Sequence, residues 1–261
     1  MRYVKIFFEQ CKLSISSIAM YRINFWLMVI QSILNSLIAI LCVEFIYDSV
    51  TEIAGWNKNE MIILICTALI VNQIFRGIVH FNQNNFIRSV RDGEFDRILL
   101  RPVNLIFQIN TGYIDASCLI SAIAPVIILI SKMDQLNNSF DPIKSVLFIL
   151  FILNGVVLLS ALMLLLYSTV FLFIRIDGLD NIYYLLMEIA NKPKEMFGHS
   201  FMFELLFALP IIPLANIPAG ILLNRTKGVD MCLSISESLI FSVLAIIAIR
   251  CGKKKYSSAS S

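Results

Sequence analysis

Charged residues are scarce in this chain. Only 15% of its 261 residues are charged, whereas 58% are hydrophobic, and the mean hydropathy is +0.81. A soluble globule of this length cannot bury so much apolar surface, and several apolar runs reach the about 20 residues that span a bilayer. The sequence therefore predicts an integral membrane protein.

Residues for catalysis and metal binding are also few. The two histidines, His80 and His199, are far apart in the sequence, and the six cysteines occur singly, without a C-x-x-C pair. No G-x-x-x-x-G-K-[ST] loop occurs among the ten glycines, and no G-x-S-x-G is present. We therefore expect no catalytic residue, no metal site and no cofactor in this chain, so any ATP would have to bind elsewhere.

Six apolar segments are predicted to be transmembrane helices. None shows an alternating ten-residue strand pattern, and a backbone in lipid must satisfy its own hydrogen bonds, so helices are expected rather than a barrel. The segments are residues 25–47, 61–81, 105–130, 146–174, a weaker one at 179–196, and 231–249. The expected fold is all-α, with a single transmembrane domain over residues 1–261.

The first 22 residues have an amphipathic helical pattern. Apolar side chains recur at helical intervals, and Lys5, Glu9, Lys12 and Ser16 occupy another face. Such a helix is expected to lie in the membrane interface, although a frayed extension of the first span would fit the same pattern.

The distribution of lysine and arginine predicts the orientation. If both termini are cytosolic, thirteen of these residues lie in inside segments and seven in outside segments, with Arg76 uncounted inside the second span. Positive residues favour the cytoplasmic side, so we expect a multi-pass protein of the bacterial plasma membrane with a cytosolic tail at residues 252–261. The basic residues match span ends and have no aromatic platform, which argues against nucleic-acid binding.

Prolines interrupt the apolar sequence between residues 197 and 228. Pro210, Pro213, Pro218 and Gly220 break the run, and irregular backbone at membrane depth needs protein or a water-filled cavity around it. We expect a re-entrant or interfacial helical hairpin that enters from the outer side. A kinked full span, which would place the C-terminus outside, is the alternative.

The most informative segment is charged and lies at residues 82–104, between two spans. Phe95, Ile98 and Leu99 are spaced at i, i+3 and i+4, which predicts a helix of one to two turns, with Asp92 and Gly93 at its start and Pro102 at its end. The charged residues around this apolar stripe are Arg91, Glu94, Asp96, Arg97 and Arg101. So short a helix is marginal in water and needs a docking partner, and we expect its stripe, with Phe95 as a plug, to contact a soluble ATPase. A solvated loop that follows the positive-inside tendency is the alternative.

Polar residues within the spans are candidates for a pathway or a subunit seam. At 1.5 Å per residue, Asp115 would lie roughly 16 Å into the third span, near the bilayer centre. It could face a translocation path or form a contact between helices. Asn72 and Gln73 on the second span leave the same two interpretations open.

The run RDGEFDRILLRPVN, from Arg91 to Asn104, resembles the motif R-x-G-x-F-D-x-x-L-x-R-P-V-N of a bacterial ABC-2 type permease family. The later run LFALPIIPLANIPAGILL is similar to the proline-rich outer segment of the same family. The resemblance implies the transmembrane subunit of an ABC transporter, usually an exporter. It also implies pairing with two ATPase subunits, which carry ATP and Mg, and with a second permease as a homodimer or a heterodimer.

Two other classes of function remain open. A secondary transporter should have inverted repeats with matched broken spans, whereas this chain has one proline-rich interruption. A membrane scaffold or immunity-type binding protein would leave the short charged helix unexplained. For a transporter, the scarcity of polar partners favours an amphipathic, lipid-like, peptide or drug substrate over a bare ion.

Overall fold

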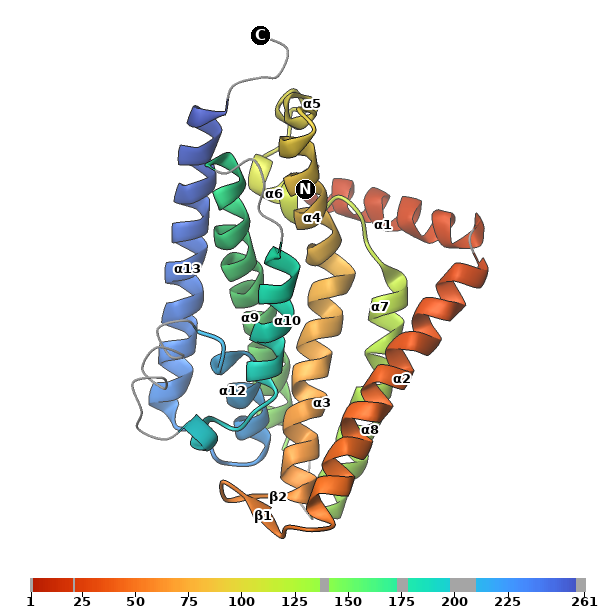
Figure 1. The fold of residues 1–261 in the computed structure, drawn as a ribbon, viewed down its shortest axis with the longest axis vertical. Helices are drawn as coiled ribbons and strands as arrows, with labels where there is room; N and C mark the ends of the chain where they lie inside the picture. The colour runs from red at the N-terminus through yellow and green to blue at the C-terminus, as the bar shows by residue number, and fades with distance from the viewer. Residues whose placement is uncertain (1, 21, 137–140, 173–177, 198–209, 257–261) are drawn as a thin grey trace.

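The computed structural model describes residues 2–20, 22–136, 141–172, 178–197 and 210–256. Helices dominate it (Figure 1), and five of the described segments are long and apolar enough to cross a membrane. These segments are Phe25–Tyr47, Lys58–Arg91, Ala116–Gln135, Pro142–Phe171 and Gly228–Lys254. The prediction of an all-α membrane protein is confirmed at this level.

The first helix projects from the bundle, whereas the second packs against three helices that follow later in the chain. Helix α1 (Arg2–Met20) lies across the upper end of the view, and α2 (Arg22–Tyr47) runs from there to the opposite end (Figure 1). The α1 helix is attached to the bundle by Ser14, which is buried and whose Oγ accepts a hydrogen bond from the backbone N–H of Ile114 at 3.1 Å. Tyr3 adds an edge contact with Phe107, with ring centroids 5.0 Å apart. The predicted N-terminal helix is therefore present.

A long central rod follows a small hairpin. Strands β1 (Glu52–Ile53) and β2 (Trp56–Asn57) pair antiparallel, and α3 (Lys58–Phe75), the π-helix η1 (Arg76–His80) and α4 (Phe81–Arg91) then continue one another. Eleven of the 18 residues of α3 are buried and none is exposed, because α2, α8, α9 and α12 pack around it. This rod joins the two ends of the molecule.

The predicted third span, residues 105–130, is wrong as a continuous helix. After the short helix α5 (Phe95–Leu99), the chain instead forms α6 (Leu105–Asn110), α7 (Ala116–Ser121) and α8 (Ile123–Gln135). Asn82 stabilises the break between α6 and α7, because its side chain accepts from Tyr113 N at 2.6 Å and donates to Tyr113 O at 2.8 Å. Those two bonds replace the helical bonds that this stretch of backbone gives up.

The second half of the chain completes the bundle. It contains α9 (Pro142–Tyr167), the 3-10 turn η2 (Ser168–Phe171), α10 (Leu179–Ala190), the 3-10 turn η3 (Lys194–Phe197), α12 (Pro213–Leu222) and α13 (Gly228–Lys255). Helix α10 has 12 residues, about 18 Å at 1.5 Å per residue, which is shorter than a bilayer core of about 30 Å. The predicted weak span at residues 179–196 is thus not a membrane-length helix within the described residues, and the count of six spans stays a prediction.

The proline-rich segment is described only in its second half. Residues 198–209 lie outside the described residues, whereas every residue of α12 is buried and the helix packs on α9 and α3. Gly155 of α9 makes the approach close, since a Cβ there would lie 2.9 Å from the backbone oxygen of Leu214. Asn216 then fixes the preceding turn, because it donates to Lys192 O and accepts from Lys194 N, each at 3.0 Å.

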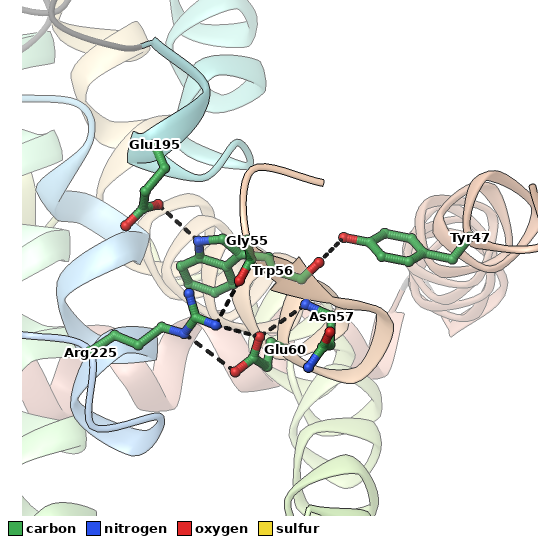
Figure 2. Close-up of polar contacts among 7 residues, drawn as sticks. All are labelled: Tyr47, Gly55, Trp56, Asn57, Glu60, Glu195 and Arg225. Carbon is green, nitrogen blue, oxygen red and sulfur yellow. Dashed lines mark hydrogen bonds and ion pairs between the residues drawn. The ribbon is translucent and has the colours of Figure 1, made fainter. Parts of the chain in front are cut away.

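Polar contacts close the end of the bundle that carries the hairpin (Figure 2). Arg225 Nη2 lies 2.7 Å from Glu60 Oε2 and 2.8 Å from the backbone oxygen of Gly55, and its guanidinium carbon is 4.9 Å from the centre of the Trp56 ring. Trp56 donates its ring N–H to Glu195 at 2.8 Å. Arg225, in the turn before α13, therefore contacts both the β1–β2 hairpin and α3. Its neighbour Trp56 connects the same hairpin to η3.

Candidate coupling site at the charged end of the bundle

The short helix predicted within the charged segment is present as α5, and Phe95 fixes it to the bundle. The Phe95 side chain is fully buried, and its ring centroid lies 5.7 Å from that of Phe86 on α4, 5.5 Å from that of Phe171 on η2 and 5.1 Å from that of Tyr256 after α13. Edge-on aromatic pairs of this kind contribute about 0.5–1.5 kcal/mol beyond their burial. Phe95 therefore anchors α5 to three other elements.

This burial corrects the expectation that Phe95 is a plug for a partner protein. The apolar stripe of α5 faces its own bundle, and Ile98 and Leu99 are also partly buried against the core. A fully buried ring cannot contact another subunit directly. The physical reason is that the chain itself supplies the docking partner that so short a helix requires.

The loop geometry sets where α5 begins. Gly93 has a φ of +73°, a left-handed conformation that glycine adopts without strain, and it turns the chain out of α4. The backbone N–H of Asp92 closes α4 by donating to Arg88 O at 2.8 Å. After Pro102, the side chain of Asn104 caps α6 by accepting from Ile106 N at 2.9 Å. Asp92, Gly93 and Pro102 thus flank the helix as predicted.

The surface of α5 that remains accessible is charged, and we call it the exposed face of α5. It consists of Glu94, Arg97, Leu100 and Arg101, and Leu100 is 84% exposed. Arg97 and Glu94 form an ion pair at 3.1 Å, but both side chains are mostly exposed, so the pair contributes little to stability. Glu94 and Arg97 can therefore exchange this ion pair for contacts with a partner protein at a small cost in free energy.

A polar groove lies beside this face. It has a volume of about 440 Å³ between α4, α5 and α6, and it is lined by the charged residues Arg88, Asp92, Glu94, Arg97 and Arg101 together with amide side chains such as Asn82 and Gln108. Both signs of charge line the groove, a property that suits a protein surface with charges of its own. Arg91 and Asp96 flank the same segment, exposed and half-buried respectively.

Asp96 also affects the ionisation of Tyr256, the residue after α13 that contacts Phe95. Burial and the nearby Asp96 carboxylate both raise the pKa of Tyr256, because each disfavours a phenolate. Tyr256 therefore stays a neutral aromatic partner for Phe95 throughout the physiological pH range.

Among the described residues, no group of three or more histidine, cysteine or acidic side chains could hold a metal ion.

The predicted pathway residues lie away from this site and contact neighbouring helices. The Tyr183 hydroxyl on α10 donates to Asn72 Oδ1, and Gln73 donates to Ser32 Oγ on α2. Asp115 corrects the expected depth, because the break before α7 makes it the N-cap of that helix, where its Oδ1 accepts from Ser117 N at 2.9 Å. It lies where the membrane-length segment begins and not near its middle.

The residues that hold α5 carried no signal in the sequence. Phe171 and Tyr256 are distant in the chain and belong to segments with no motif, so their convergence on Phe95 follows only from the packing of η2 and α13. Asn82 is similar: it looked like one polar residue among several, yet it stabilises the break at Tyr113, 31 residues later.

Comparison with known proteins gives one match. The chain matches the model of a family described as ABC-2 family transporter protein, over residues 14–260. No curated protein and no solved structure matches it. The family match extends over α5 and nearly all of the bundle.

Proposed function

Since this chain belongs to the ABC-2 transporter family, we propose that it is the transmembrane permease subunit of an ATP-binding cassette transporter. ATP and Mg would bind to separate ATPase subunits, and the chain itself would have no catalytic role. The cargo best suited to its apolar helices is an amphipathic, lipid-like, peptide or drug molecule, moved outward across a bacterial plasma membrane.

The observation that carries the proposal is the construction of α5. Its exposed face presents Glu94, Arg97 and Arg101, while Phe95 on its other side is fully buried in the bundle. A partner that binds this face would push on Phe95, and Phe95 contacts α4, η2 and the end of α13. Because α4 continues into η1 and α3, a displacement of α5 acts on the full length of the central rod.

The rest of the assembly follows from the family. A second permease, either another copy or a related chain, would complete the transporter, and both termini would lie on the ATPase side. Helix α5 and the C-terminal end of α13 lie at the same end of the molecule, which supports that orientation (Figure 1). The sixth span would be formed by α10 with the turn after it, and α12 would be the inner arm of a re-entrant hairpin on the outer side.

The test reverses charge on the exposed face of α5. In the R97E/R101E variant, the two cations that face a partner become anions, so we expect less ATPase to copurify with the tagged chain in mild detergent and substrate export to fall. The matched control is K144E/K192E, which reverses two cations near the opposite end of the bundle, at the start of α9 and after α10. That control should leave both measurements unchanged.

Two results would contradict the proposal. If R97E/R101E leaves ATPase recovery, ATP hydrolysis and export at the wild-type level, then α5 is not the coupling element. If the wild-type chain transports its substrate without any ATPase, it is a secondary transporter.

A further inference from the structure

A second polar cavity lies between the central rod and α7. It has a volume of about 240 Å³, and its polar lining comes from Arg76, His80, Asn84, Asn85 and Arg88 on the rod and from Asp115, the N-cap of α7. Four of the rod residues, all but Asn85, are spaced four apart, so they line one side of the rod over more than three turns. The coupling role of α5 does not account for this cavity.

The π-helix η1 contributes Arg76 and His80 to the wall of the cavity. Within η1, the backbone oxygen of Gly77 accepts a hydrogen bond from Asp115 N at 2.8 Å. A Cβ on Gly77 would lie 2.7 Å from Cδ2 of Leu119, so glycine lets α7 approach the rod closely. Single-turn π-helices occur frequently at functional sites, and this one brings the start of α7 against the arginine-bearing side of the rod.

The two arginines outnumber the one carboxylate that lines this cavity. Neither Arg76 nor Arg88 forms an ion pair or a side-chain hydrogen bond with any residue that the structure describes. Asp115 lines the same cavity, but its Oδ1 already accepts from both the backbone N–H and the hydroxyl of Ser117, at 2.9 and 2.5 Å. Two guanidinium groups with free donors in one cavity favour an anionic ligand that has several acceptor oxygens.

The neighbouring side chains hold the cavity in shape. The ring of His80 stacks on that of Tyr183 with centroids 4.8 Å apart, and Asn84 Nδ2 lies 3.2 Å from His80 Nε2. Tyr183 in turn is hydrogen-bonded to Asn72 on α3. His80 and Asn84 therefore belong to a network that reaches from α3 to α10.

The depth of the cavity agrees with the lipid headgroup region. From Lys58 to Arg76 the rod rises about 27 Å, which nearly equals a hydrocarbon core of about 30 Å. The amphipathic helix α1 is attached at the same level, because Ser14 contacts Ile114, the residue before Asp115. Basic cavities between helices at this depth suit phosphorylated headgroups.

We propose that the cavity lined by Arg76, His80, Asn84 and Arg88 binds a phosphate group, carried either by an anionic phospholipid or by a soluble phosphate. The two guanidinium groups would hold the phosphate oxygens, and Asn84 would donate a further hydrogen bond. Arg88 also lines the polar groove beside α5, whereas Arg76, His80 and Asp115 do not. The proposed site needs neither ATP nor an ATPase subunit.

The test measures ligand retention by the purified full-length chain with native mass spectrometry. The probes are dioleoyl phosphatidylglycerol, dioleoylglycerol, which lacks the phosphate, and inorganic phosphate. We expect one bound phosphatidylglycerol and about tenfold weaker retention of dioleoylglycerol, and a similar loss of phosphatidylglycerol in R76Q and in R88Q. R76K, which keeps the charge but loses the planar fork, should fall between wild type and R76Q.

The control variant is R250Q, which removes an exposed arginine on α13. It should retain phosphatidylglycerol as the wild type does. Arg88 is also exposed, so R88Q tests the site even if R76Q fails to fold. Inorganic phosphate that displaces the lipid at millimolar concentration would identify the ligand as soluble phosphate, whereas no displacement would identify it as lipid; either result supports the phosphate site.

Equal retention of dioleoylglycerol and phosphatidylglycerol would overturn the inference. The same holds if R76Q and R88Q both keep wild-type retention, or if R250Q loses as much lipid as they do. These outcomes are independent of ATPase recovery, so the coupling function and the phosphate site can fail separately.

Discussion

At the scale of single side chains, the two ends of the bundle are held together by different forces. Phe95 at the charged end has only aromatic neighbours in its anchoring cluster, so its contribution is apolar burial and ring packing. Arg225 at the hairpin end contributes ionic and hydrogen bonds together with a cation–π contact. Substitution of Phe95 should therefore remove apolar packing, whereas substitution of Arg225 should remove ionic and hydrogen bonds.

Replacement of Phe95 by alanine should loosen the charged end. Truncation of a fully buried phenylalanine typically costs about 3–5 kcal/mol, because it removes the burial and leaves a cavity. The measurement is the thermal unfolding of the chain in detergent. L100A is the control, since Leu100 is 84% exposed and its loss should leave stability unchanged. Equal stability of F95A and L100A would show that Phe95 is not the anchor.

Replacement of Arg225 by alanine should open the hairpin end around Trp56. The variant leaves Glu60 without its bidentate partner, at a cost of about 1.5–3 kcal/mol for hydrogen bonds to a charged group. In a W26F background Trp56 is the single tryptophan, so its fluorescence reports on this end alone. We expect stronger quenching by acrylamide in R225A and an intermediate effect in R225K, which cannot reproduce the planar fork.

The control for Arg225 is K192A, which removes an exposed ion pair with Glu188 at the same end. Such a pair contributes about 0–1 kcal/mol, so quenching of Trp56 should not change. If R225A also left Trp56 shielded, the network in Figure 2 would not be what closes this end.

At the scale of elements, α12 depends on a close approach to α9. A methyl group at Gly155 would lie 2.9 Å from the backbone oxygen of Leu214, and backbone cannot move aside as a side-chain tip can. G155A should therefore displace α12 and destabilise the chain by about 1–3 kcal/mol, as overpacking does. G228A is the matched control, because nothing lies within 4 Å of a Cβ there. Unfolding in detergent compares the two, and an unchanged G155A would mean that α12 can shift without loss.

For α5, local sequence signals predicted the helix but not which way its apolar stripe faces. The spacing of Phe95, Ile98 and Leu99, with Gly93 and Pro102 on either side, was enough to predict a short helix, because these signals are local. The same spacing could not show which way the stripe faces. That depends on Phe171 and Tyr256, which only tertiary packing brings near.

The break between α6 and α7 could not be predicted for a similar reason. Residues 105–130 read as one apolar run, and hydrophobicity alone does not distinguish a straight helix from an interrupted one. What stabilises the break after α6 is a pair of hydrogen bonds between Tyr113 and the side chain of Asn82, on a different helix, which donates one and accepts the other. The inferred depth of Asp115 was wrong because it was counted along a helix that does not continue.

At the scale of the whole molecule, the arrangement of the ends predicts the topology. The exposed face of α5 lies at the end opposite the hairpin and the start of α13 (Figure 1). In a background without native cysteines, we expect V229C to react with a membrane-impermeant maleimide in intact cells and L100C to react only after permeabilisation. Both side chains are exposed on this chain, at 68% and 84%, so the chain itself does not shield either thiol. Labelling of L100C in intact cells would reverse the orientation and remove the basis for coupling through α5.

The short helix α12 has a consequence for biogenesis. Its ten residues reach about 15 Å, half of what a translocon needs in order to release a segment sideways into lipid as an independent span. All ten are enclosed, chiefly by α9 and α3, which leave the ribosome earlier, and by α13, which leaves it later. The nascent chain must therefore insert its long helices first and pack the proline-containing helix α12 between them afterwards. Packing of α12 is thus a late step of maturation.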